Sequence, residues 1–161
     1  LLKSLKMLNE KINVKLLLIG YGPNKVKIEN YIKNYNLLKN VKILSFQKNI
    51  YKYINISDIF VLTSIFEGLP NVILEAMTLK KYVISTNCPT GPNEILNNGK
   101  YGTLFKLRDY KNLARKILKY YYNKKIYNKK IKAAYKSLNR FDFNKNCEKY
   151  LLIIKGELQL D

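Results

Sequence analysis

The chain has 161 residues, the length of one globular domain with room for a sizeable core. It carries 30 lysines and arginines against 11 acidic residues, which gives a formal net charge of +19. The lysines are spread along the whole chain, arginine is scarce and no zinc-finger or RNA-recognition pattern occurs, which argues against a dedicated nucleic-acid-binding protein. Two explanations of the charge remain open. It can reflect a biased composition without functional meaning, or it can hold the protein near an anionic membrane surface.

The remaining composition excludes several classes of site. There is no histidine, and Cys88 and Cys147 are isolated, so neither a zinc site nor a disulfide framework is expected and a reducing cytoplasm is favoured. No Asp-x-Asp pair occurs that could clamp a metal-bound diphosphate. No apolar run approaches the ~20 residues that span a bilayer. The chain starts without methionine or a signal-peptide pattern, so we expect a fragment.

Strand-like and helix-like segments alternate along the chain. The predicted strands are residues 14–19, 41–44, 59–62, 82–85 and 102–105. The predicted helices are residues 1–11, 25–35, 50–56, 72–79 and 93–97. This alternation predicts an α/β fold, a Rossmann-like doubly wound parallel sheet in a single domain over residues 1–161.

The last third of the chain is predicted to be helical, with helices over about residues 109–154. A lysine- and tyrosine-rich stretch reaches about residue 136, and a final helix covers residues 144–154. The run Tyr120-Tyr121-Tyr122 could form a surface on which bases stack. At helical spacing we expect these tyrosines to be partly packed and partly exposed instead.

Ligands of doubly wound sheets bind beyond the carboxyl ends of the strands. Four loops are predicted there, at residues 20–24, 45–49, 63–71 and 86–93.

The third loop contains the most informative segment. Glu67 and Glu75 are separated by seven residues in an apolar stretch of an otherwise acid-poor chain. Pro70 suits the first position of a helix and Asn71 suits its cap, so Glu67 precedes the helix and Glu75 lies one turn inside it. Both carboxylates can then face one cleft, next to free N–H groups and the positive end of the helix dipole. Carboxylates accept hydrogen bonds from vicinal hydroxyls, and amides suit a diphosphate, so the segment suits a sugar nucleotide.

Residues 64–77, with the sequence SIFEGLPNVILEAM, resemble the Glu-x7-Glu motif of the family 4 retaining glycosyltransferases. Residues 82–86 and 88–95 are similar to the next strand and loop of bacterial polysaccharide and lipid-linked-sugar transferases in that family. The resemblance spans roughly residues 1–152. It implies the C-terminal, donor-binding half of a GT-B fold, with the N-terminal acceptor domain and an upstream Arg/Lys pair outside this chain.

The resemblance also implies roles for individual residues. The counterpart of Glu75 hydrogen-bonds the donor ribose, and that of Glu67 faces the donor sugar, where a carboxylate can stabilise an oxocarbenium-like transition state. Backbone N–H groups are candidates for binding phosphate and sugar oxygens. They belong to Gly68, Leu69, Asn71 and Val72.

The other candidates have alternative explanations. Gly20 and Gly22 resemble the glycine turn beside the donor diphosphate, although alone they indicate a tight turn, and Lys25 occupies the place of the third glycine of an NAD-binding fingerprint. Lys48 could border the base or be a solvated loop residue. Glu94 could contact the donor or be an ordinary first-turn acid.

The sequence therefore predicts the donor domain of a hexosyltransferase, inactive alone, that takes a nucleotide-diphosphate sugar and serves a saccharide or lipid-linked acceptor. We expect no cofactor, no metal and no nucleic-acid partner, and a cytoplasmic location with contact at the inner face of the membrane. The alternative is a non-enzymatic basic module that binds nucleic acid or membrane. A GT-B epimerase fits the Glu67 to Glu75 spacing poorly.

Overall fold

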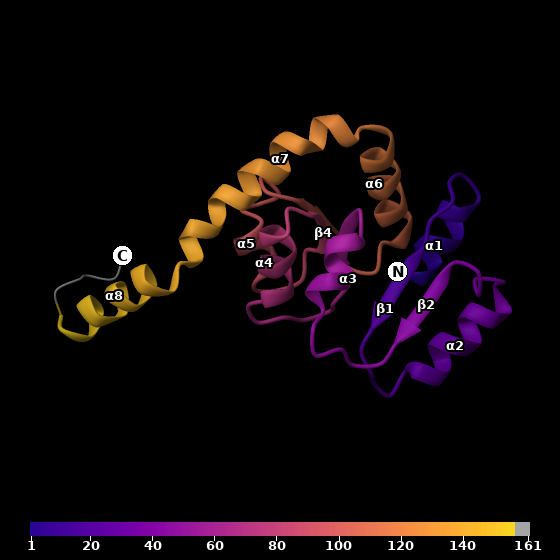
Figure 1. Cartoon of the computed structure of the whole chain (residues 1–161), viewed down its shortest axis with the longest axis horizontal. Coiled ribbons are helices and arrows are strands. Elements are labelled where there is room, and N and C mark those ends of the chain that lie inside the picture. Colours follow the sequence, from indigo (N-terminus) through magenta and orange to yellow (C-terminus); the bar gives the residue numbers. More distant parts are fainter. Residues whose placement is uncertain (157–161) are drawn as a thin grey trace.

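The computed structural model describes residues 1–156, in which helices and strands alternate up to β5 and helices follow (Figure 1). The strands are β1 (Leu16–Ile19), β2 (Val41–Leu44), β3 (Ile59–Leu62), β4 (Tyr82–Thr86) and β5 (Thr103–Phe105). The helices among them are α1 (Leu2–Asn9), α2 (Lys25–Asn34), α3 (Tyr51–Ile56), α4 (Asn71–Thr78) and α5 (Pro92–Ile95). The later helices are α6 (Tyr110–Tyr122), α7 (Lys124–Ser137), the 3-10 turn η1 (Leu138–Phe141) and α8 (Phe143–Ile154).

All strand pairs are parallel, so the predicted α/β class is confirmed. β1 pairs with β2 in a two-stranded sheet, and β3, β4 and β5 form a three-stranded sheet with β4 in the centre. Within the described residues β1 does not pair with β3, so the strands form two sheets where the sequence predicted one.

Two boundaries differ from the prediction for visible reasons. The first strand begins at Leu16 and not at Val14, because the backbone groups of Val14 are hydrogen-bonded to side chains. The Asn9 Oδ1 accepts from the Val14 N–H at 3.0 Å, and the Asn40 Nδ2 donates to the Val14 carbonyl at 3.0 Å. The helical stretch after residue 109 is divided at Asn123, whose backbone angles (φ −128°, ψ 28°) leave the helical range.

The core lies on both faces of the three-stranded sheet. All residues of β4 are buried, and successive side chains alternate between the faces: Tyr82 and Ile84 pack towards α6, and Val83 packs with Ile73 and Met77 of α4. This sheet therefore provides a rigid frame on which the neighbouring loops are held.

A smaller core covers the two-stranded sheet. It contains Leu5, Ile32 and Leu37 as its buried residues. Leu8 of α1 belongs instead to the core that contains Tyr82. Helix α1 therefore packs into both cores, and it lies against α6.

The tyrosine run is partly packed and partly exposed, as predicted. Tyr120 is 8% exposed, Tyr121 46% and Tyr122 67%. The Tyr120 ring stacks on Tyr82 with ring centroids 5.1 Å apart. One tyrosine of the three is thus a core residue.

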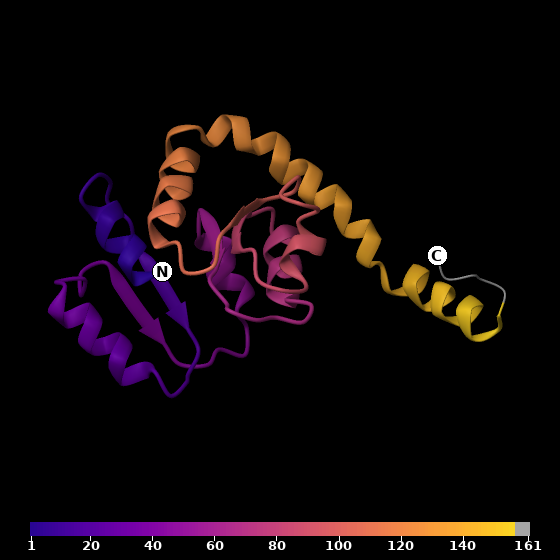
Figure 2. The same cartoon turned by 180° about the vertical axis from the view of Figure 1, so that it is seen from behind.

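Helix α7 crosses the three-stranded unit, and α8 projects beyond it (Figures 1 and 2). None of the residues of α8 is buried. Within residues 1–156 no helix is both long and apolar enough to cross a membrane.

Candidate functional site

The predicted site lies at the carboxyl ends of the strands. Because the strands within each sheet are parallel, the loops after β3 and β4 leave the same edge of the large sheet, and the loops after β1 and β2 leave the same edge of the small one. Residues 63–70 connect β3 to α4, and residues 87–91 connect β4 to α5. These two loops contact each other and form the centre of the site.

Glu67 is held by hydrogen bonds on both its side chain and its backbone. The Ser64 hydroxyl donates to the Glu67 Oε1 at 2.5 Å, and the Thr90 hydroxyl donates to the Glu67 carbonyl. The Ser64 carbonyl in turn accepts from the buried Thr86 at 2.7 Å. The carboxylate is therefore positioned by groups that follow β3 and β4.

Gly91 fixes the distance between the two loops. A Cβ atom at Gly91 would lie 2.1 Å from the Gly68 carbonyl oxygen and 2.4 Å from the Pro70 Cδ. Its φ of +78° also favours glycine. Only a residue without a side chain allows the Glu67 loop to approach this closely.

Helix α4 begins one residue earlier than its predicted cap suggests. Asn71 is the first helical residue and makes no side-chain capping bond, so its prediction as the cap is wrong. Pro70 occupies the N-cap position, because its ψ of 90° lies outside the helix while its carbonyl accepts the first helical bond from Ile73 at 2.9 Å. The predicted position of Glu75, one turn into the helix, is confirmed.

The start of α4 leaves several backbone donors free. Among the described residues, no acceptor is hydrogen-bonded to the N–H groups of Gly68, Leu69, Asn71 and Val72. Unpaired N–H groups and the helix dipole together favour an anion at this end. The segment can therefore bind a phosphate group through its backbone.

Glu75 has one satisfied and one unsatisfied carboxylate oxygen. The Tyr51 hydroxyl of α3 donates to its Oε1 at 3.4 Å, whereas its Oε2 is buried without a partner in the described part of the chain. A buried acceptor without a hydrogen bond costs ~1–3 kcal/mol, and more if it is charged. A ligand hydroxyl that donates to Oε2 would remove this cost.

Gly20 and Gly22 follow β1 at the edge of the small sheet. The Gly20 N–H donates to the Leu44 carbonyl at 3.0 Å, and its φ is +138°. No atom lies within 4 Å of where a Cβ would stand at either glycine. The loop is open, as a backbone that approaches a ligand requires, and its predicted role at the diphosphate stays a prediction.

Lys48 and Glu94 are not tied to the two acids. Both are exposed, and neither side chain makes a hydrogen bond or ion pair within residues 1–156. The neighbouring Asn49 accepts from the Tyr51 N–H at 3.1 Å and so helps to start α3. Roles for Lys48 and Glu94 remain predictions.

Sequence reasoning missed the residues that hold the acids: Tyr51, Ser64, Thr90 and Gly91. Ser64 lies three residues before Glu67, and a hydroxyl at that spacing is a usable signal. Tyr51 comes from another helix, so only the fold brings it to Glu75. Within residues 1–156 no three Cys, Asp or Glu side chains are grouped in a way that could hold a metal ion.

The chain is similar to known proteins over most of its length. Residues 1–137 match the family model described as glycosyl transferases group 1. An uncharacterised glycosyltransferase of Methanocaldococcus jannaschii is 42% identical over 120 residues, which are 66% of this chain and 30% of that protein.

Two further proteins are similar over most of the chain. An N-acetylgalactosamine-N,N'-diacetylbacillosaminyl-diphospho-undecaprenol 4-alpha-N-acetylgalactosaminyltransferase of Campylobacter jejuni is 28% identical over 88% of this chain and 40% of its own length. The structure of a Staphylococcus aureus TarM variant, in complex with fondaparinux, alpha-GlcNAc-glycerol and UDP, superposes with a TM-score of 0.85 at 26% identity and covers 92% of this chain and 31% of that one. The chain thus spans less than half the length of each of these proteins.

Proposed function

The chain belongs to the glycosyl transferases group 1 family, and on this basis we propose that it is the donor-binding part of a retaining hexosyltransferase of glycosyltransferase family 4. Two features of α4 carry the proposal: the Glu75 Oε2 is buried without a partner among residues 1–156, and the N–H groups at the start of the same helix have no acceptor there. The first suits a ribose hydroxyl and the second suits a diphosphate. A nucleotide-diphosphate sugar carries ribose hydroxyls and a diphosphate next to each other.

The two acids divide the donor between them. Glu75 accepts from the ribose hydroxyls with Tyr51 as its neighbour, and the N–H groups of α4 bind phosphate oxygens. Glu67, positioned by Ser64, faces the hexose. As the bond from the anomeric carbon to the diphosphate breaks, positive charge develops on the ring, and a nearby carboxylate stabilises it. The acceptor hydroxyl forms the new bond to the anomeric carbon on the same face and gives its proton to the departing diphosphate.

The acceptor is a saccharide or a lipid-linked saccharide. The name of the Campylobacter relative specifies an undecaprenol-linked substrate, which supports a lipid-linked acceptor. UDP in the TarM complex supports a uridine nucleotide as the first donor to test. A location in the cytoplasm at the inner face of the membrane fits such an acceptor.

We propose that the acceptor site lies in a further, N-terminal domain. The chain spans less than half the length of these relatives, which supports this proposal. The 161-residue chain should bind a nucleoside diphosphate weakly and should not transfer sugar.

The decisive test is titration calorimetry of the variants Glu75→Gln and Glu67→Gln. Charge-assisted hydrogen bonds contribute roughly 1.5–3 kcal/mol each, so Glu75→Gln should weaken UDP binding about ten- to a hundredfold. Glu67→Gln should leave UDP binding nearly unchanged and weaken UDP-sugar binding, because its partner is the hexose. Equal losses of UDP affinity in both variants would refute this division, and wild-type affinity in Glu75→Gln would refute the role of Glu75.

A second titration tests whether UDP binding requires a metal ion. The free N–H groups and the helix dipole supply the positive potential at the diphosphate, so EDTA should leave UDP affinity unchanged. Loss of most of the affinity in EDTA would show that a cation holds the phosphates.

The alternative, a basic module that binds nucleic acid or membrane, makes different predictions. Binding through phosphates weakens steeply as salt rises. Recognition of ribose hydroxyls by Glu75 should survive 0.5 M salt, and an RNA oligomer should not compete with UDP. Competition by RNA would favour the basic module.

A further inference from the structure

A concave site lies between α6 and α7, away from Glu67 and Glu75. It is a cavity of about 400 Å³, many times the roughly 30 Å³ that one water molecule occupies in the liquid. Its lining residues come from both helices, their junction and the start of β5: Thr103, Lys116, Lys119, Asn123, Ile126, Tyr127 and Lys130. Thr103 is the first residue of β5, so the cavity lies towards the amino ends of the strands, opposite the edge from which the Glu67 loop leaves. We call it the α6–α7 pocket.

Three lysines from two helices line this pocket. Lys116 and Lys119 are three residues apart and therefore neighbours on α6. Lys130 faces them from α7, and its ammonium donates to the Gly99 carbonyl at 2.9 Å and to the Gly102 carbonyl at 3.3 Å. An ammonium has three N–H donors, so one donor of Lys130 remains.

The positive charge of the pocket is not neutralised within the described part of the chain. No carboxylate lines it, and the ion pairs of residues 1–156 involve other lysines, namely Lys25 with Glu29 and Lys124 with Asp58. Burial lowers the pKa of Lys130, and the charges of Lys116 and Lys119 lower it further. The three lysines therefore repel one another until an anion joins them.

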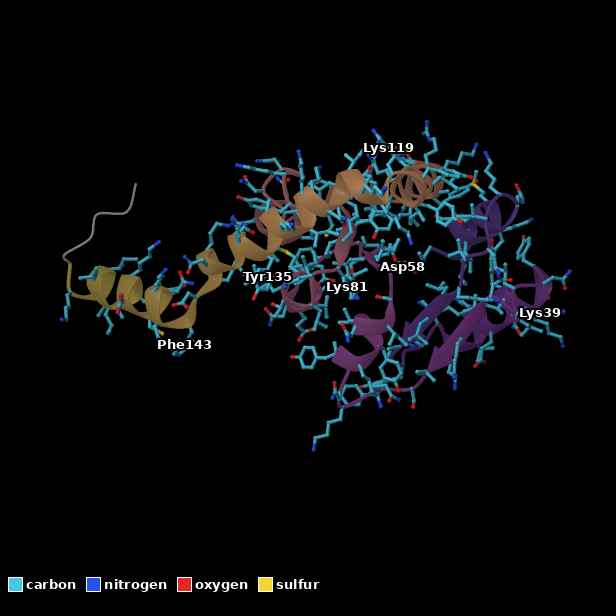
Figure 3. All side chains as sticks on the ribbon, turned by 45° about the horizontal axis from the view of Figure 1, so that its top comes forward. Lys39, Asp58, Lys81, Lys119, Tyr135 and Phe143 are labelled. Atoms are coloured by element: carbon cyan, nitrogen blue, oxygen red, sulfur yellow. The ribbon has the colours of Figure 1, made fainter. Side chains whose placement is uncertain are left out.

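The walls of the pocket are fixed independently of the lysines. The Tyr127 ring packs against Tyr82 and Tyr120, with ring centroids 4.6 and 5.4 Å apart. The Asn123 Nδ2 donates to the Lys119 carbonyl at 2.9 Å and ties the turn between the helices to α6. The lysines are thus presented by two helices that meet at an angle, and Lys119 lies near their junction (Figure 3).

We propose that the α6–α7 pocket binds a phosphate-bearing anion, with Lys116, Lys119 and the remaining donor of Lys130 around the phosphate. Phosphate oxygens accept strong charge-assisted hydrogen bonds from ammonium groups. The ligand is either a free phosphorylated molecule or the phosphate headgroup of an anionic lipid, since both present the same chemistry.

The first experiment uses inorganic pyrophosphate as the probe and the double variant Lys116→Gln/Lys119→Gln. Lys130 is left intact because it holds two carbonyls. The control Lys27→Gln/Lys39→Gln removes the same charge from exposed positions outside the pocket, and Figure 3 shows Lys39 well away from Lys119. Pyrophosphate affinity should fall at least tenfold in the pocket variant and less than twofold in the control. Equal losses in both variants would refute the pocket.

Nuclear magnetic resonance then locates the bound pyrophosphate. The amide signals of Asn123 and Tyr127 should shift, and these shifts should disappear in the pocket variant. Shifts confined to Gly68 and Val72 would place pyrophosphate at the start of α4 and overturn the proposal. The same spectra with UDP report on the acids' site, so failure there and failure at the pocket are separate results.

Sedimentation with vesicles distinguishes the two sources of phosphate. Vesicles that contain phosphatidic acid should bind the wild type and the control more than the pocket variant, with competition by pyrophosphate, if the ligand is a headgroup. No difference between the variants on vesicles, together with the tenfold pyrophosphate effect, assigns a free phosphorylated ligand. Neutral phosphatidylcholine vesicles are the blank.

Discussion

The two sheets of this molecule use similar parallel strands, but only the large sheet has a central strand covered on both faces. Every residue of β4 is buried, whereas all residues of β1, like those of β3 at the edge of the large sheet, are only partly buried. The large sheet positions both acids, through Ser64, Thr86, Thr90 and Gly91 for Glu67 and through α4 for Glu75. The small sheet presents a glycine loop, which would act through its backbone. Side chains that need defined positions thus lie on the better-packed unit, as a preorganised site requires.

The largest effect expected from this comparison is in core truncation. Ile84→Ala removes a fully buried side chain from the centre of β4 and should lower the free energy of unfolding by about 4–5 kcal/mol. Ile32→Ala, in the small core, should cost about 2 kcal/mol because its surroundings can collapse more easily. Urea denaturation measures both. Equal costs would show that the small sheet is as tightly packed as the large one.

The loop contact at Gly91 gives a smaller effect that is specific to the site. Gly91→Ala places a methyl group against the Gly68 carbonyl at a positive φ, so it should destabilise the fold by about 2–3 kcal/mol and weaken UDP-sugar binding. Gly22→Ala has open space and should change the free energy of unfolding by less than about 0.5 kcal/mol. A tolerated Gly91→Ala would show that the Glu67 loop can move away without loss.

The smallest effect concerns the pH dependence of the large core. Burial raises the pKa of Tyr82 to about 12 from its usual 10, so the unfolded chain loses this proton first. Stability from the neutral hydroxyl is complete below pH 10 and is lost as the pH rises towards 12. At pH 8 the Tyr82→Phe variant should be about 1 kcal/mol less stable than the wild type, because it lacks the 2.5 Å hydrogen bond to Thr103. This difference in the free energy of unfolding should disappear above pH 11. Tyr150→Phe, at an exposed position, serves as the control. If the stability difference between Tyr82→Phe and the wild type did not change with pH, the raised pKa of Tyr82 would be contradicted.

The sequence predicted the elements well because hydrophobic runs and helical spacing are local. It predicted Glu75 one turn into α4 from Pro70 and Asn71. It misplaced the start of the first strand, because the bonds from Asn9 and Asn40 to Val14 depend on tertiary contacts. It could not separate the strands into two sheets, since strand order is not encoded in periodicity. The bond from Tyr51 to Glu75 and the close approach of Gly91 to Gly68 are likewise visible only when the chain is folded.

Helix α1 has a consequence for how the protein emerges from the ribosome. It is made before α6, yet Leu8 is covered by a core that includes Leu113 and Ile117 of α6, and the Ser4 hydroxyl donates to the Tyr110 carbonyl, 106 residues later, at 2.9 Å. Such distant contacts form late and slow folding. During synthesis, one face of α1 therefore stays uncovered until α6 has left the ribosome.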